Sequence, residues 1–133
     1  MKVVLDTNVI IAAFATHGLC HLLVESALPH HEIVLSPALL TEIHANLKKK
    51  VKLPDERIKL ILRFLQNHSV FIKDKKIAGI RCRDHSDIKV LALAINGGAD
   101  VIVTGDEDLL VLKNRLQVDI LSPREFWERL RTV

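Results

Sequence analysis

The chain has 133 residues, of which 49% are hydrophobic and 26% are charged. This composition predicts one domain over residues 1–133 and excludes disorder. No apolar run approaches the ~20 residues that span a bilayer. The net charge of +3 permits a polyanionic partner without requiring one. Aromatic residues make up only 4%, so we expect any nucleic acid to be bound mainly through its phosphates.

We expect a cytoplasmic protein. Asp6 interrupts the first apolar run before a signal-type segment can form. The two cysteines, Cys20 and Cys82, lack metal-type spacing and are expected to be reduced thiols.

Strand-like and helix-like segments alternate along the chain. Hydrophobic periodicity, Ser-Pro helix starts at Ser36 and Ser122, and the Gly97-Gly98 stop define their limits. The expected strands are residues 2–5, 32–35, 70–72, 101–103 and 118–121, and the expected helices are 18–28, 37–49, 54–65, 86–96, 109–113 and 123–130. Several strands are apolar without alternation, which indicates a parallel sheet buried on both faces in an α/β fold. Ligands of such sheets bind beyond the carboxyl ends of the strands.

Acidic residues occur at this edge of the predicted sheet. Asp6 follows the first strand and Asp106 the fourth, while Asp87 opens the helix before the fourth strand and Glu42 lies within the helix after the second. Each has an ordinary explanation, as a helix cap, a first-turn acid or an exposed helix glutamate. Together, four converging carboxylates would repel one another unless a cation lay among them. Their all-oxygen chemistry suits Mg²⁺ or Mn²⁺.

The motifs VVLDTNVIIAAF, IVLSPALLTEI, CRDHSDIKVLALAINGGADVIVTGDEDLL and ILSPREFWERL together resemble the PIN domain family, and within it the toxin components of toxin–antitoxin pairs. The resemblance runs from Lys2 to about Leu130. It implies a Rossmann-like three-layer α/β/α sandwich with a five-stranded parallel sheet of order 3-2-1-4-5. It also implies a metal-dependent ribonuclease that uses Mg²⁺ or Mn²⁺, forms a homodimer and has a cognate antitoxin protein as its partner.

The same resemblance assigns roles to residues. It makes Asp6, Glu42, Asp87 and Asp106 the catalytic and metal-binding acids. Supporting polar positions fall on Thr7, Asn8, Thr104 and Asp108. The chain departs from many relatives in the stretch DHSDIK, where His85, Ser86 and Ile88 replace acids, which puts a second metal site in doubt, although Asp84 offers partial compensation. We expect a basic rim for RNA at Lys48, Lys49, Lys50, Lys52, Arg81 and Arg83.

Two other functions stay open at this point. A catalytically weak or inactive module would use the same fold to bind RNA or a protein partner, with the acids acting only as helix caps. A small phosphatase would use Asp6 as a nucleophile, but such enzymes generally have a second acid two residues later, where this chain has Asn8.

Overall fold

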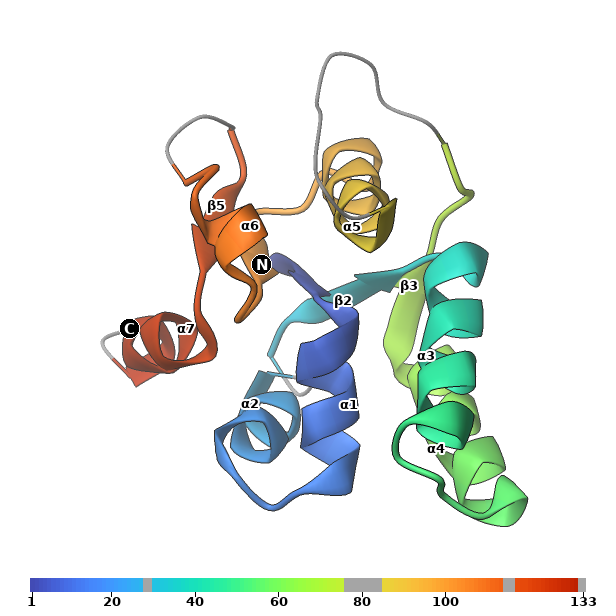
Figure 1. The fold of residues 1–133 in the computed structure, drawn as a ribbon. Helices are drawn as coiled ribbons and strands as arrows, with labels where there is room; N and C mark the ends of the chain where they lie inside the picture. Colours follow the sequence, from blue (N-terminus) through green and yellow to red (C-terminus); the bar gives the residue numbers. More distant parts are fainter. Residues whose placement is uncertain (28–29, 76–84, 114–116, 132–133) are drawn as a thin grey trace.

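The computed structural model describes residues 1–27, 30–75, 85–113 and 117–131. Strands and helices alternate along this chain (Figure 1). In chain order they are β1 (Lys2–Leu5), α1 (Thr7–Ala15), α2 (Leu19–Ala27), β2 (Glu32–Leu35), α3 (Pro37–Lys49), α4 (Asp55–His68), β3 (Ser69–Phe71), α5 (His85–Asn96), β4 (Val101–Val103), α6 (Glu107–Leu110), β5 (Asp119–Leu121) and α7 (Pro123–Arg131).

The strands form one parallel sheet of order β3-β2-β1-β4-β5. β1 lies at its centre, with β2 on one side and β4 on the other. The expected sheet order is therefore confirmed. Because all strands run the same way, the residues that follow β1, β2, β3 and β4 meet at one edge of the sheet.

Helices cover both faces of the sheet (Figure 1). α1 and α3 lie on one face, where α2 and α4 pack beside them, and α5 covers the other face. This arrangement follows from right-handed crossovers that first lead away from β1 through β2 to β3 and then return to β4. Within the described ranges, no single helix has both the length and the hydropathy of a membrane span. The helical residues 7–15 and 19–26 have this length and hydropathy only when they are counted together, and the chain bends by 100° between them.

The hydrophobic core lies on both faces of the central strands. Val3, Val4 and Leu5 of β1 are all at most 1% exposed. The edge strand β3 differs, since Val70 and Phe71 are exposed. The expectation of buried, non-alternating strands holds at the centre of the sheet and fails at this edge, because β3 has only one neighbouring strand among the described residues.

Two helices begin where their Ser-Pro pairs predict. Ser36 Oγ accepts a hydrogen bond from the Leu39 backbone N–H at 3.3 Å, and Pro37 occupies the first turn of α3. At α7, the Glu125 N–H donates to Ser122 Oγ at 3.1 Å, and the Ser122 N–H donates to Glu125 Oε1 at 3.1 Å. This reciprocal pair is a capping box, which satisfies backbone donors that the helix itself leaves free.

Several element boundaries differ from the predicted ones, and those of β3 and of the short helix after β4 are two of them. β3 begins one residue early, at Ser69, although the Ile72 N–H still donates to Leu35 O and continues the pairing with β2. The short helix after β4 covers Glu107–Leu110 instead of residues 109–113. It begins early because the Asp106 carboxylate accepts a hydrogen bond from the Asp108 N–H and starts the helix there.

Candidate functional site

Asp6 and Thr104 lie side by side at the carboxyl ends of the neighbouring strands β1 and β4. Leu5 is paired with Val103, and the Asp6 N–H donates to Val103 O at 2.9 Å, so the pairing with β4 extends one residue beyond β1. Thr104 is fully buried, and its hydroxyl donates to Asp6 Oδ2 at 2.8 Å. Two residues 98 positions apart are thereby fixed against each other at the centre of the sheet edge.

The Asp6 carboxylate does not cap the helix that follows it. Asp6 occupies the N-cap position of α1, yet its side chain makes no capping hydrogen bond. It is only 5% exposed. Burial raises the pKa of the Asp6 carboxyl, and the nearby Asp106 and Glu42 carboxylates raise it further, while hydrogen bonds from Thr104 and the Thr7 N–H oppose the rise. A carboxylate that only caps a helix does not have to be buried beside two other acids, so capping does not explain the position of Asp6.

Asp106 has two partners that hold it in place. Its backbone N–H donates to Thr104 Oγ1 at 3.0 Å, and its Oδ1 accepts from the Asp108 N–H at 2.9 Å. The Thr104 hydroxyl therefore links Asp6 to Asp106, as a donor to one and an acceptor from the other. The ordinary alternative for Asp106, a helix cap, is present in the structure, and the capping leaves the carboxylate half-buried beside the other acids.

Three acids come together near the start of α5. Asp87, Asp106 and Asp108 each place one carboxylate oxygen within 4.8 Å of the others. Asp87 is 2% exposed, and Asp106 and Asp108 are half-buried. Asp87 reaches the group from the first turn of α5, while Asp106 and Asp108 belong to the start of α6. This acidic group is able to hold a metal ion, and a cation there would relieve the repulsion among its members.

Glu42 supplies a further carboxylate from α3. It precedes the fully buried Ile43 and is itself half-buried. Its Oε2 atom is shielded from solvent and has no hydrogen-bond partner. The Thr7 hydroxyl oxygen is in the same situation. Buried polar atoms normally have partners, so these two oxygens suit a site that binds a further polar or charged group.

The other predicted site residues are spread more widely. Asn8 is exposed on α1. Lys48, Lys49 and Lys50 are exposed where α3 ends, about 9–12 Å along the helix axis from Glu42 at a rise of about 1.5 Å per residue. Lys52 lies beyond that end, also exposed, with a positive φ of 58°. Arg81, Arg83 and Asp84 lie outside the described residues, as do the side chains of His85 and Ser86.

The structure gives Asp108 a more central position than a supporting role requires. Its carboxylate belongs to the same close group as Asp87 and Asp106. The signal for this position is present in the sequence as two acids separated by one residue directly after β4, in Gly105-Asp106-Glu107-Asp108. The sequence indicates this acid but not its distance from Asp87, because that distance depends on how α5 packs against β4.

Residues 2–108 match a protein-family model described as PIN domain. The chain belongs to the PIN domain family. The match covers β1, β4 and all the acids discussed above. A relative from Methanocaldococcus jannaschii, the uncharacterized protein MJ1680, is 30% identical over 146 residues that cover 96% of this chain and 90% of the relative.

Two solved structures share the PIN domain fold. A chain from the crystal structure of VapBC2 from Rickettsia felis, bound to a DNA fragment from their promoter, has a TM-score of 0.64 and 18% identity, covering 92% of this chain and 98% of that one. The PIN domain endonuclease Utp24 has a TM-score of 0.54 and 17% identity, covering 91% of this chain and 84% of that one. The family and sheet topology expected from the sequence are both confirmed.

Proposed function

We propose that the chain is a divalent-metal-dependent endoribonuclease that hydrolyses RNA phosphodiester bonds at the acidic edge of its sheet. The observation that carries the proposal is the environment of Asp6. Its carboxylate is buried and caps no helix, and its pKa is raised by burial and by the charges of Asp106 and Glu42. Membership of the PIN domain family supports a nuclease activity. The fold shared with the endonuclease Utp24 agrees with it.

The donor set fits a hard divalent cation. All candidate ligands are carboxylate oxygens, Asp87, Asp106 and Asp108 are close together, and Glu42 Oε2 is buried without a partner. Mg²⁺ and Mn²⁺ prefer such oxygen ligands and keep coordination positions for water and phosphate. Asp6, Asp87 and Asp106 would hold the ion, with Asp108 as a further candidate. Bound there, an ion of this kind would supply positive charge that polarises the scissile phosphate and stabilises the leaving oxygen.

The protein's own residues supply the remaining chemistry. We assign Glu42 to orienting the attacking water, because its buried oxygen is free to accept a hydrogen bond. Thr104 holds the Asp6 carboxylate in one orientation and braces the Asp106 backbone at the same time. Fixing the ligands in this way lowers the cost of arranging them when substrate binds.

The biological setting is also a proposal. We infer that the chain is the toxin of a toxin–antitoxin pair, that a cognate antitoxin protein binds it, and that it forms a homodimer. The motifs quoted above and the fold shared with a chain of VapBC2 support this setting. Light scattering coupled to size-exclusion chromatography tests the dimer, and a monomer at high protein concentration would contradict it.

Cleavage of a labelled RNA by Asp6→Asn tests the main proposal. Asparagine preserves the shape and the oxygen that Thr104 contacts, but it removes the charge. We expect loss of at least about 100-fold in Mn²⁺-dependent cleavage, the scale at which catalytic groups act. Asp55→Asn, an exposed acid at the start of α4, is the matched control and should cleave normally. Full activity in Asp6→Asn would refute the assignment.

A non-catalytic binding module is the second candidate. One observation favours it: Asp106 caps α6, so at least one of the acids has a structural use. A Mn²⁺ titration separates the two candidates. Metal binding that is lost in Asp106→Asn supports the nuclease, whereas no binding and no thermal stabilisation by Mn²⁺ supports the module.

A further inference from the structure

A cavity of about 460 Å³ opens beside the acidic site at the same edge of the sheet. Lys2 is paired with Glu32 and Val3 with Ile33, so the register places Ser36 next to Asp6 just beyond β1 and β2. Ser36 lines the cavity. The opposite wall is α5, where Ile88 and Lys89 directly follow Asp87. The cavity therefore begins at Ser36, one strand away from Asp6, and none of the acids is among the described residues that line it.

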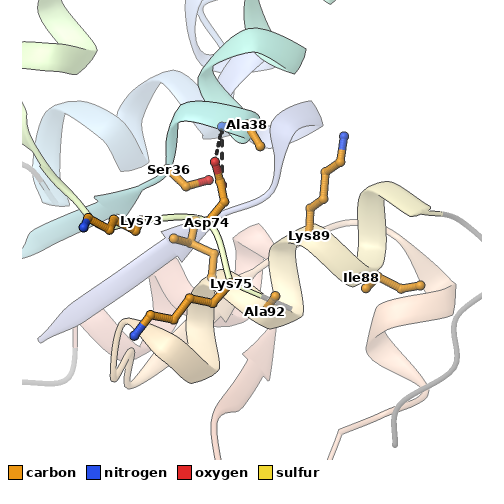
Figure 2. A pocket seen from close by; sticks show the side chains of 9 residues that line it. Ser36, Ala38, Lys73, Asp74, Lys75, Ile88, Lys89 and Ala92 are labelled. Carbon is orange, nitrogen blue, oxygen red and sulfur yellow. Dashed lines mark hydrogen bonds between the residues drawn. The ribbon is translucent and has the colours of Figure 1, made fainter. Parts of the chain in front are cut away.

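The cavity combines an apolar floor with basic edges (Figure 2). Ile88, Ala92 and Leu93 come from one face of α5, and Ala38 from the start of α3. Positions three and four apart on a helix share a face, which explains how α5 contributes this surface.

Three lysines surround the apolar floor. Lys73 and Lys75 follow β3, Lys89 belongs to α5, and all three are exposed. The carboxylate among the described lining residues, Asp74, accepts hydrogen bonds from the Ala38 N–H at 3.1 and 3.4 Å. As Figure 2 shows, Asp74 is directed at the start of α3. The lysines therefore give the cavity a positive surplus.

We propose that this cavity binds a nucleotide of the RNA strand next to the phosphate held at the acids, an inference that rests on the proposed function. The volume lies within the usual range of small-molecule sites, about 300–1,000 Å³. A nucleotide presents a flat, partly apolar body and an anionic phosphate, which match the floor and the lysines. The RNA strand must also continue past the acids, and the cavity is adjacent to them.

The first test measures how RNA binding depends on salt. A fluorescein-labelled single-stranded oligoribonucleotide is titrated with the full chain in EDTA, so that binding is separated from metal-dependent cleavage. Each phosphate contact contributes about 0.7 to the slope of log K against log salt for a single strand. We expect Lys89→Ala and Lys75→Ala each to reduce the slope by about 0.7. Lys59→Ala, an exposed lysine on α4, should leave it unchanged.

A second variant tests the apolar floor. Ala92 is 8% exposed and borders the cavity, so Ala92→Phe places a ring in the space. We expect about tenfold weaker oligoribonucleotide binding, with a melting temperature that shows a folded protein. Leu60→Phe, at an exposed position on α4, is the control.

In the cleavage assay with Mn²⁺, Lys89→Ala should raise KM and leave kcat nearly unchanged.

The outcomes separate this inference from the nuclease proposal. The nucleotide site is overturned if Lys89→Ala keeps the wild-type salt slope and Ala92→Phe keeps the wild-type affinity. It is also overturned if the wild type does not bind the oligoribonucleotide. Both conclusions hold even if Mn²⁺-dependent cleavage is found. Binding that is sensitive to both variants supports the nucleotide site even if no cleavage is found. A labelled peptide rich in Glu and Leu is the third arm. If the two variants weaken binding of this peptide but not of the RNA, the cavity is a protein-docking site and the proposal fails.

Discussion

Asp6 is a buried carboxylate at the carboxyl end of the central strand, and its surroundings are not those of a helix cap. An aspartate after an apolar strand is as typical of a helix cap as of a catalytic site. In the structure it makes no capping bond, is buried, and accepts a hydrogen bond from Thr104. The sequence predicts the position of Asp6, because strand ends are visible as the limits of apolar runs. It does not predict the burial, which is created by elements far away in the chain.

The raised pKa of Asp6 makes a prediction about stability without metal. A carboxyl whose pKa is higher in the folded state binds protons more tightly there than in the unfolded chain. The free energy of unfolding of the metal-free protein should therefore fall as pH rises from the ordinary carboxyl pKa through the raised one. Asp6→Asn removes this titration, so its melting temperature at neutral pH should exceed that of the metal-free wild type. Thermal melts across pH test this, and equal pH profiles would contradict it.

Thr104 makes a second prediction at this scale. Thr104→Val keeps the shape but removes the donor to Asp6 and the acceptor of the Asp106 N–H. Because a buried group left without its partner costs roughly 1–3 kcal/mol, we expect a loss of this size in the free energy of unfolding. Cleavage should fall as well. Thr41→Val, at an exposed position on α3, is the control and should change stability by less than about 0.5 kcal/mol. Urea unfolding measures both.

Among the elements, α5 ends with two glycines that have different functions. Gly98 has a φ of 63°, the left-handed conformation that terminates helices. Gly97 instead allows a close approach: a Cβ there would lie 2.8 Å from Leu93 O and 2.9 Å from Val34 Cγ1. The sequence predicts the helix end from the Gly-Gly pair. It does not predict that the first glycine packs against β2, since this contact exists only in the folded sheet.

Gly97→Ala should therefore destabilise the protein by about 1–3 kcal/mol, the usual cost of overpacking. Gly18→Ala is the matched control, because a Cβ at Gly18 meets only Thr16 Oγ1 at an ordinary 3.6 Å. Denaturant midpoints of the two variants give the comparison. If both alanines were tolerated equally, the close packing of α5 against β2 would be wrong.

Helix starts are more visible in the sequence than the limits of short elements. Ser36 and Ser122 mark α3 and α7 because capping is a local interaction between residues three positions apart. The short helix α6 begins earlier than its apolar residues predict, because Asp106, whose N–H donates to Thr104 Oγ1, already caps it. Local chemistry is visible in sequence, whereas a competition decided by a tertiary contact is not.

For the whole molecule, the sequence patterns predict a parallel sheet, and the family resemblance supplies the strand order. Apolar periodicity does not by itself distinguish the order β3-β2-β1-β4-β5 from others, because the pattern of a strand does not specify which strands lie beside it. The sheet order decides the site, since it makes β1 and β4 neighbours. It also brings Ser36 beside Asp6 and so aligns the cavity with the acids.

Metal binding should stabilise the whole fold. A ligand present at about 100 times its Kd adds about 2.7 kcal/mol to the free energy of unfolding, which for a chain of this size is a rise of roughly 10 °C in Tm. We expect this shift with Mn²⁺ or Mg²⁺ in the wild type, its reversal by EDTA, and little of it in Asp106→Asn. Differential scanning calorimetry measures it. An identical shift in Asp106→Asn would place the ion elsewhere.

The hydrogen bond between Thr104 and Asp6 also bears on when activity first arises during synthesis. Its two ends are 98 residues apart, so most of the polypeptide must emerge from the ribosome before the acids can assemble. A nascent or truncated chain that stops before β4 carries Asp6 and Glu42 without Asp106. Under the proposed function such a fragment should be inert toward RNA, and cleavage should begin only once nearly the entire chain has been translated and folded.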